Sequence, residues 1–423
     1  MSNLHVRYLL VGGGLASISA AEAIRLRDRE GELLIVGQEI NRPYHRPPLS
    51  KQFLRREQSH DDLFTHPSSW YEEHRVRLRS GRRAAQLDVA RRAVTLDNAE
   101  EVSFDQLLLA TGAHARHLHI PGSDLPNLYY LRTIEDAERL HHAIEQAERS
   151  KRSRGDVTVA IIGGGVLGVE LAASFKQVGL KVELIAGAEH PWPKFAGETT
   201  GRFVGKYLES KGIAVHAGRA ARLEGDGRVQ RIVLADGTAI GCDFAVAASG
   251  AMANKDLLRG TSIAAEMAIL VDARCRTNAP GIYAAGDCAA ILDPLFGKHR
   301  ILDHWDNAVV SGKLAGTNMA GGDAVYDAVN TFFSDVFEWT MNAWGEARFV
   351  DRRIVRGGAQ SSAEKADFVE FGIGSDGRIA QVIAVNHSGE DEIFKALVKG
   401  RVRTEGKEEV LREPGGDLRG LLE

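Results

Sequence analysis

The sequence predicts an α/β protein in which two parallel-sheet units are followed by a smaller α+β domain. The first observation is that Val159–Leu171, VAIIGGGVLGVEL, passes from a buried-strand pattern through glycines into a helical pattern. The second is that Tyr8–Ala21, YLLVGGGLASISAA, repeats this arrangement near the N-terminus. The third is a change to short strands after about Tyr326. A strand, a glycine turn and a helix in this order are typical of Rossmann-like units, and two such units imply two dinucleotides.

The glycines of the later unit have the spacing of a pyrophosphate-binding turn. Gly163, Gly165 and Gly168 stand as G-x-G-x-x-G. The first permits the tight turn, the second lets backbone approach the phosphates, and the third lets helix and strand pack closely. The helix that follows presents free N–H groups to the anion. A glycine turn without a nucleotide is the alternative, but its repetition in one chain favours a flavin and a nicotinamide as the natural pair.

Composition limits the classes of function. The 423 residues are enough for two or three domains, and they are 44% hydrophobic and 26% charged. A net charge of -4 gives no case for nucleic-acid binding. No apolar run approaches the ~18–20 residues of a membrane span, and the early strand leaves no room for a signal peptide. Cys242, Cys275 and Cys288 have no metal-ligand or C-x-x-C spacing, so we expect no metal and a reducing cytoplasm.

One segment is unusually basic. Arg75–Arg92 reads RVRLRSGRRAAQLDVARR. We interpret it as a solvated strand face in preference to a binding patch.

The first unit contains a candidate ribose ligand. A strand is expected over Tyr8–Val11, a helix over Ala16–Arg27 and a strand over Glu32–Val36, with Ser17 at the third motif position. Glu39 follows the second strand, where an acid accepts hydrogen bonds from an adenosine ribose. An ordinary loop glutamate is the alternative.

A proline-rich segment follows this unit. Pro43–Lys51, PYHRPPLSK, has three prolines that fix an extended backbone. Arg46 suits a pyrophosphate, and Lys51 suits a redox centre that gains negative charge. A simple surface loop is almost as compatible with these residues.

The middle of the chain holds the second unit. The chain is expected to change domain near Pro121–Asn127. The expected elements are a strand over Leu107–Gly112, helices over Glu135–Arg149, Ala172–Val178 and Thr199–Lys211, a strand over Lys181–Ile185, and a strand over Phe244–Gly250 that returns toward the first unit.

The last third begins with an acid at a strand end. Gly281–Asp287, GIYAAGD, predicts a strand whose Asp287 reaches a polyol such as a ribitol, or caps a helix. A helix is expected over Asp303–Asn318. Strands over Asp367–Ile373 and Ile379–Val385 around the turn Gly374–Arg378 predict a hairpin, and a helix over Glu390–Val398 completes the α+β domain.

Taken together, these motifs resemble the flavoprotein reductases that serve iron–sulfur proteins, namely the putidaredoxin, rubredoxin and dioxygenase ferredoxin reductases. The resemblance covers nearly the whole chain. It rests on VGGG at Val11–Gly14, RPPLSK at Arg46–Lys51, LLATG at Leu108–Gly112, LRT at Leu131–Thr133, IIGGGVLGVELA at Ile161–Ala172, YAAGDCA at Tyr283–Ala289, the WDNAVVSGKLAGTNMAG stretch at Trp305–Gly321, and FFSD at Phe332–Asp335.

The resemblance implies a glutathione reductase type of fold. Its FAD domain would comprise residues 1–117 and 246–325, its nicotinamide domain residues 118–245 and its C-terminal interface domain residues 326–423. It implies FAD contacts from Gly12, Gly14, Leu15, Ala16, Ser17, Glu39, Arg46, Lys51, Ala84, Ala110, Thr111, Gly112, Arg132, Gly286, Asp287, Trp305 and Phe333. It implies coenzyme contacts from Gly163, Gly165, Val166, Leu167, Gly168 and Gly250, with Asp303 and His304 where the two cofactors meet. Lys51 and Glu170, one from each dinucleotide unit, would pair beside the flavin and tune it.

Three departures from the family pattern bear on function. No C-x4-C follows the first helix, so electrons must pass from the flavin directly to an external acceptor. Ala186 stands where an NAD-selective enzyme often has an acid, yet no arginine pair suits a 2′-phosphate, so we expect NADH with NADPH as the alternative. Phe333 stands where relatives often have tryptophan.

The resulting hypothesis is a cytoplasmic monomer or homodimer that passes a hydride from NADH to FAD and then single electrons to a ferredoxin or rubredoxin of an oxygenase system. A quinone, a small radical or oxygen is the alternative acceptor. A redox-sensing interaction protein similar to apoptosis-inducing factor is the alternative class. Candidate basic docking residues are Arg352, Arg353, Arg356, Lys395, Lys399, Arg401 and Arg403.

Overall fold

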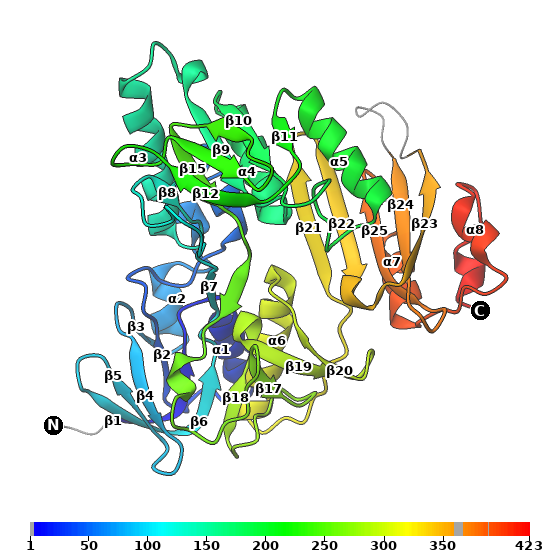
Figure 1. Ribbon diagram of the computed structural model, residues 1–423. Coiled ribbons are helices and arrows are strands. Elements are labelled where there is room, and N and C mark those ends of the chain that lie inside the picture. Colours follow the sequence, from blue (N-terminus) through cyan, green and yellow to red (C-terminus); the bar gives the residue numbers. More distant parts are fainter. Residues whose placement is uncertain (1–3, 359–366, 388) are drawn as a thin grey trace. The chain divides into compact units, whose positions relative to one another are not determined.

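A computed structural model describes residues 4–358, 367–387 and 389–423 (Figure 1). They form two compact units. Unit 1 comprises Met1–Arg46, His60–His114 and Ala251–Ala328, and unit 2 comprises Pro47–Ser59, Ala115–Gly250 and Val329–Glu423. Both units contain parallel sheets with helices, which confirms the predicted α/β class. The domain boundaries inferred from the sequence stay a prediction.

Unit 1 is built on a seven-stranded sheet in the order β3-β2-β1-β6-β5-β4, with β18 also paired to β6. Strands β1, β2, β3, β6 and β18 pair in parallel, whereas β4 and β5 extend the sheet antiparallel. The strands of this sheet are β1 Leu4–Val11, β2 Leu33–Val36, β3 Val76–Arg79, β4 Ala84–Asp88, β5 Ala93–Leu96, β6 Glu101–Leu109 and β18 Ile282–Ala284. The remaining elements of unit 1 are β16 Ala251–Ala253, β17 Ile269–Val271, β19 Ala289–Asp293, β20 Lys298–Ile301, α1 Leu15–Arg27, α2 Ser68–Glu73 and α6 Trp305–Met319. Strand β7, Ala113–Ala115, lies in the sequence where the chain passes from unit 1 to unit 2.

Small residues bring helices α1 and α6 into close contact. A Cβ added at Gly312 would overlap the carbonyl of Ala16, and one at Gly316 would overlap the carbonyl of Ala20. Residue numbers rise together along both helices, so the helices run parallel. Glycines four residues apart on one face let the backbones approach, and both helices therefore begin on the same side of the unit.

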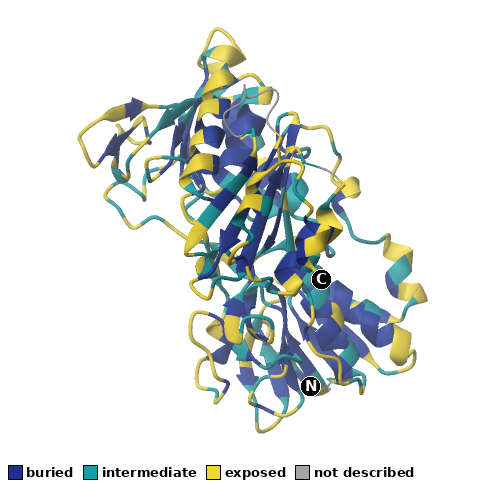
Figure 2. Ribbon diagram, turned by 90° about the vertical axis from the view of Figure 1, so that its right-hand side faces the viewer, coloured by how far each residue is buried: buried dark blue, intermediate teal, exposed yellow. Residues whose placement is uncertain are grey.

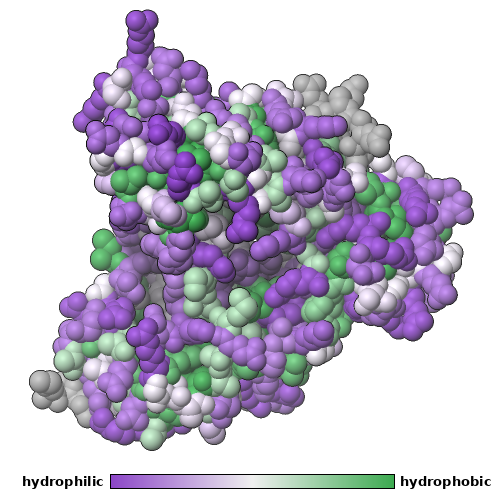
Figure 3. Space-filling model, viewed as in Figure 1, coloured by the Kyte–Doolittle hydropathy of each residue, from purple (hydrophilic) through white to green (hydrophobic). Residues whose placement is uncertain are grey.

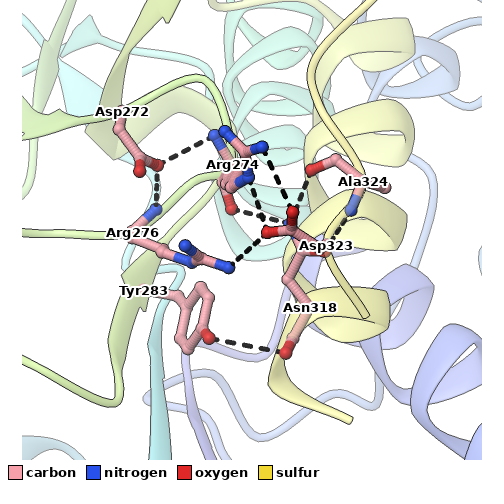
Figure 4. A network of polar contacts seen from close by, with 7 residues as sticks. All are labelled: Asp272, Arg274, Arg276, Tyr283, Asn318, Asp323 and Ala324. Carbon is pink, nitrogen blue, oxygen red and sulfur yellow. Dashed lines mark hydrogen bonds and ion pairs between the residues drawn. The ribbon is translucent and has the colours of Figure 1, made fainter. Parts of the chain in front are cut away.

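The end of α6 is held by a polar network (Figure 4). Arg274 and Arg276 both donate to the carboxylate of Asp323. Asn318, in the last turn of α6, donates to the carbonyls of Arg274 and Ala324 and accepts from the N–H of Ala324. The segment after β17 is thereby joined to the C-terminal end of the helix.

Unit 2 contains a second parallel sheet in the order β11-β10-β9-β15-β8. The strand expected at Phe244–Gly250 is found as β15, Phe244–Ala247, and the chain returns to unit 1 soon after it, at Ala251, as expected. Strand β15 lies inside the second sheet, between β9 and β8 and parallel to both. Its four residues are all buried, which explains their unbroken apolar pattern. The elements of this part are β8 Leu128–Tyr129, β9 Thr158–Ile162, β10 Lys181–Ile185, β11 Ala214–His216, β12 Ala220–Glu224, β13 Arg231–Leu234, β14 Ala239–Gly241, β15 Phe244–Ala247, α3 Ile134–Arg149, α4 Val166–Gln177 and α5 Glu198–Ser210.

The C-terminal residues of unit 2 form an antiparallel sheet in the order β21-β22-β25-β24-β23. The predicted hairpin is confirmed, because β24 pairs with β25 along nearly its whole length. The elements are β21 Thr331–Val336, β22 Trp339–Gly345, β23 Arg352–Gly357, β24 Phe368–Ile373, β25 Ile379–Val385, α7 Asp391–Lys399 and α8 Glu408–Arg412. Buried residues follow the strands of the sheets, and exposed ones lie in loops and on outer helix faces (Figure 2).

Helix α5 is bound to this sheet by a buried carboxylate. Glu370 on β24 has no solvent exposure, and it accepts hydrogen bonds from the Gly197 N–H at 2.8 Å and the Thr200 hydroxyl at 2.5 Å. Arg353 lies 2.5 Å away and balances its charge. A glutamate 170 residues distant in sequence therefore caps the N-terminus of α5.

The basic segment at Arg75–Arg92 is a solvated strand face, as predicted. Arg77 pairs with Glu32, Arg79 with Glu100 and Arg91 with Glu101. These arginines are thus matched by acids of the neighbouring strands.

No helix among the described residues is both long and apolar enough to span a bilayer. On the face shown in Figure 3, hydrophobic residues lie in small separate groups among hydrophilic ones.

The contact between α1 and α6 gives a prediction about stability. Gly312→Val should lower the free energy of unfolding by about 2 kcal/mol or more, because a side chain there meets the backbone of Ala16, which cannot move aside. Denaturant unfolding measures this. Lys313→Ala on the exposed side of the same helix is the control and should change stability little. Equal stability of the two variants would contradict the proposed packing constraint.

Candidate functional site

The two glycine turns have the same geometry. Gly12 has φ of 127° and Gly163 has φ of 128°. A Cβ at Gly12 would overlap the carbonyl of Ala110, and one at Gly163 would overlap the carbonyl of Ala248. Each turn therefore requires glycine for its positive φ and for the close approach of the next strand's end.

Helices α1 and α4 begin at these turns with open N-termini. Their N-cap residues, Gly14 and Gly165, have no side chain, and a Cβ at either would meet no other described atom within 4 Å. The open space and the free N–H groups fit an anion. The first two residues of each helix are Leu15 and Ala16 in α1 and Val166 and Leu167 in α4. Their backbone N–H groups are among those that have no acceptor within the helix.

The third motif position differs between the turns. A Cβ at Gly168 would overlap the Gly163 carbonyl, as the close-packing interpretation predicts. Ser17 occupies the corresponding place in the first unit. It is fully buried, and among the described residues its hydroxyl has no hydrogen-bond partner.

The predicted ribose and phosphate ligands of the first unit lie together. Arg46 Nη2 donates to Glu39 Oε1 at 2.6 Å, and Arg46 Nη1 donates to the Tyr44 hydroxyl at 2.8 Å. Tyr44 donates to the other Glu39 oxygen at 2.5 Å. Burial opposes the charge of Arg46, but Tyr44, Glu39 and Asp287 outweigh it and raise the pKa of Arg46. Sequence reasoning missed Tyr44, whose spacing from Glu39 carried no known signal.

A second group of residues surrounds the end of β6. Thr111 and Asn254 exchange two hydrogen bonds, from the Thr111 hydroxyl at 2.6 Å and from the Asn254 amide at 2.8 Å. Gly286, with φ of 72°, donates its N–H to Ser311 on α6 at 3.0 Å. The segment Ala110–Gly112 and the turn that bears Asp287 thus stand at the carboxyl ends of adjacent strands, where open sheets bind ligands. Ala84, the predicted adenine contact, is the first residue of β4.

The N-terminus of α6 lies on the same side of unit 1 as that of α1. The contact of Gly312 with Ala16 places seven residues of α6 before the crossing point, about 10 Å of helix. Trp305 begins the helix, and its indole N–H donates to His45 Nδ1 at 3.1 Å. His304 holds the N-cap position without capping the helix through its side chain, and Asp303 before it is exposed. Two positive helix ends are therefore available to one extended ligand.

Lys51 and Glu170 form a buried ion pair in unit 2. Their charged atoms are 3.2 Å apart, and the side chains are 5% and 10% exposed. Ser50 donates to one Glu170 oxygen at 2.6 Å and Ser334 donates to the other at 2.7 Å. We expected the two residues to come from different units, but both belong to unit 2, because Pro47–Ser59 packs with it.

Two further residues of FFSD reach this pair. Asp335 Oδ2 lies 3.7 Å from the Lys51 ammonium, and the Phe333 ring lies 5.2 Å from it. Lys51 is therefore held by two carboxylates and an aromatic face. The family resemblance implied Lys51, Glu170 and Phe333 but not the two serines.

Two other predicted residues also lie in unit 2. Arg132 lies two residues before α3, and its backbone N–H donates to Asp136 at 2.9 Å. Gly250 has φ of 105° and accepts from the Arg116 N–H at 2.9 Å. The structure does not test their roles toward a cofactor, which stay predictions.

The basic docking surface expected near the C-terminus was partly wrong. Arg353 pairs with the buried Glu370, and Arg356 is itself buried and donates to the carbonyls of Val410, Pro414 and Gly416. Arg401 pairs with Asp376 at 2.6 Å. These arginines hold the domain together, and the sequence could not separate them from solvated ones.

The cysteines are unsuited to redox chemistry. Burial raises the pKa of Cys242 to about 12, with Asp243 and Glu183 adding to the shift. Burial also raises the pKa of Cys275 and of Cys288, which lies next to Asp287. A thiol is nucleophilic and readily oxidised only as thiolate, so these residues are structural.

This gives a prediction about thiol reactivity. At about pH 8 the native protein should react with less than about one equivalent of a disulfide reagent in the time that the unfolded protein releases three, because the thiolate fraction is very small. The measurement is the absorbance of the released thiolate with and without denaturant. Rapid reaction of two thiols in the native protein would contradict the structural assignment.

Comparison with known proteins agrees with this arrangement. The family model described as pyridine nucleotide-disulphide oxidoreductase matches residues 6–312. The chain is 31% identical over 415 residues to the ferredoxin–NAD(+) reductase component of a biphenyl dioxygenase system from Paraburkholderia xenovorans, covering 98% of this chain and 97% of that protein.

Two solved structures share the fold. The ferredoxin reductase for the CYP199A2 system of Rhodopseudomonas palustris has a TM-score of 0.87 at 25% identity, covering 99% of this chain and 100% of that one. Putidaredoxin reductase, in its covalent complex with putidaredoxin, has a TM-score of 0.87 at 25% identity and covers 99% of both chains. With the paired glycine turns, these matches show that the chain is an oxidoreductase of the pyridine nucleotide-disulphide oxidoreductase family.

Proposed function

We propose that this protein is an NADH-dependent flavoprotein reductase that passes single electrons to a small iron–sulfur protein. The observation that carries the proposal is the occurrence of two glycine turns of equal geometry in a chain without a reactive cysteine pair. Two turns suit two dinucleotides, and without a redox disulfide the electrons must go directly to an external acceptor. The relatives are named as ferredoxin reductases, which supports an acceptor of this kind.

The residues of unit 1 fit FAD. The open N-terminus at Gly14 suits the pyrophosphate, Glu39 suits the adenosine ribose, and Asp287 suits a ribitol hydroxyl. Trp305 begins the helix whose positive end suits the negative charge of a reduced flavin. Bound there, FAD supplies the chemistry, because it can accept a hydride and release its two electrons one at a time.

The residues of unit 2 fit the nicotinamide coenzyme. Gly163, Gly165 and Gly168 form its pyrophosphate turn, with Gly250 near the end of β15. We propose NADH in preference to NADPH, because Ala186 and Gly187 bring no cation for a 2′-phosphate.

Lys51 and Glu170 would tune electron transfer without acting as acid or base, since hydride transfer requires neither. A buried ammonium held between carboxylates has a fixed position. Such a charge stabilises negative charge that develops near it more effectively than a mobile surface lysine does.

Removing the ammonium should slow flavin reduction. Lys51→Ala should retain FAD but reduce it with NADH about tenfold or more slowly in stopped flow, because Glu170 is left buried without its counter-charge. Lys181→Ala, which removes an exposed lysine of the same unit paired at 3.7 Å with Asp156, is the control. An unchanged rate in Lys51→Ala would remove both residues from the site.

Salt dependence tests the nature of the acceptor. With a [2Fe–2S] ferredoxin, NADH-driven reduction should fall as salt rises beyond ~0.1–0.2 M, because ions screen the encounter of two proteins. Reduction of ferricyanide, which needs no docking surface, should change much less.

Charge reversal at Lys399 and Arg403, two exposed members of the predicted basic group, should weaken the ferredoxin reaction, whereas reversal at exposed Arg29 should not. Equal salt responses with the two acceptors would contradict a protein acceptor. Absence of NADH oxidation with any acceptor would contradict the proposed function itself.

A further inference from the structure

The loop after β10 is joined at both of its ends to the second glycine turn. The Gly164 N–H donates to the Ala186 carbonyl at 3.2 Å, and the Trp192 N–H donates to the Gly164 carbonyl at 2.8 Å. Residues 187–191 therefore form a short loop, here called the arch, whose two flanking residues are both hydrogen-bonded to Gly164, the middle glycine of the turn. Glu189 lies at the centre of this arch, and its side chain is 82% exposed.

The corresponding loop of the first dinucleotide unit can be compared with this one, because the two units share the same hydrogen bonds. The Gly12 N–H donates to the Val36 carbonyl at 2.8 Å, and the Gly163 N–H donates to the Ile185 carbonyl at 2.9 Å. Val36 and Ile185 are the last residues of β2 and β10. The two turns are thus bonded to the neighbouring strand at corresponding positions.

The next residue confirms this correspondence. The Gly37 N–H donates to the Arg79 carbonyl at the end of β3, and the Ala186 N–H donates to the His216 carbonyl at the end of β11, both at 2.9 Å. Gly37 therefore corresponds to Ala186.

The acids then occupy similar positions in the two units. Glu39 follows Gly37 by two residues, and Glu189 follows Ala186 by three. Each acid pairs with an arginine: Glu39 with Arg46 at 2.6 Å and Glu189 with Arg202 at 3.2 Å. The residue directly after the strand is Ala186, so the acid of the second unit lies three residues beyond the position that the sequence pattern indicates.

We infer that Glu189 binds the adenosine ribose of the coenzyme and selects NADH against NADPH. This inference rests on the proposed function of the second unit as a nicotinamide site. A carboxylate accepts hydrogen bonds from the 2′- and 3′-hydroxyls of NADH, whereas the 2′-phosphate of NADPH would bring like charges together.

The surroundings of Arg202 support this selection. An arginine near the ribose could itself bind a 2′-phosphate. Here Arg202 donates to Glu198 at 2.7 Å as well as to Glu189 at 3.2 Å, and Glu198 is the largest cause of its raised pKa. One guanidinium between two carboxylates leaves the group with a net negative charge, which favours hydroxyls over a phosphate.

Two variants that are matched in charge test the inference. Glu189→Gln and Glu198→Gln each remove one negative partner of Arg202, but only Glu189 stands on the arch. Glu189→Gln should raise the ratio of kcat/KM for NADPH to that for NADH about tenfold, measured with ferricyanide, since a charged hydrogen bond to the ribose is lost. Glu198→Gln should raise the ratio less, by about two- to threefold, because it removes charge from the group but no hydrogen bond to the ribose.

Calorimetric binding of NAD+ and NADP+ gives a second readout that is independent of turnover. The affinity ratio should shift in the same direction, and further in Glu189→Gln than in Glu198→Gln. An unchanged ratio in Glu189→Gln, or equal shifts in both variants, would overturn the assignment. If the wild-type protein oxidises neither coenzyme, the proposed function fails, while the two binding ratios still decide the role of Glu189.

Discussion

The structure depends on the close approach of a strand end to a glycine turn, which occurs twice. A Cβ at Gly12 would overlap the carbonyl of Ala110, directly after β6, and a Cβ at Gly163 would overlap the carbonyl of Ala248, directly after β15. This approach sets the direction of the following helix, and the open N-termini of α1 and α4 result from it. The other candidate dinucleotide ligands belong to the same two units as these contacts. They are the acids after the second strand of each unit, the segments Ala110–Gly112 and Ala248–Gly250, and the turn that bears Asp287.

Local patterns were sufficient to predict much of this arrangement. The spacing of glycines gave both turns, and apolar runs located β1, β9, β15 and β18, because buried parallel strands need no alternation. The pairing of Lys51 with Glu170 came from the family resemblance, since residues 119 positions apart have no local relation.

Other features had no such signal. Tyr44 bonds to Glu39 at a spacing of five residues that matches no known motif, and Ser334 bonds to Glu170, 164 residues distant. Nothing in their neighbours distinguishes these two residues from other polar ones. The partners of Arg353 and Arg356 come from elsewhere in the fold, so two arginines of a basic cluster in the sequence are structural, one half-buried and one buried. The sheet to which β15 belongs is likewise a property of pairing, which a strand pattern does not contain.

The carboxylate of Glu370 has a consequence for the order in which the chain can fold. The first turn of α5 is completed by a residue on β24, and the aromatic face of the helix packs on β22 and β24 through Phe203 and Tyr207 against Trp339 and Phe368. During synthesis the second dinucleotide unit emerges before those strands do. Closing so long a loop carries an entropic penalty and slows folding. Helix α5 therefore reaches its final stability only after the C-terminal sheet has formed, and a chain truncated before β24 would leave an apolar helix face open to aggregation.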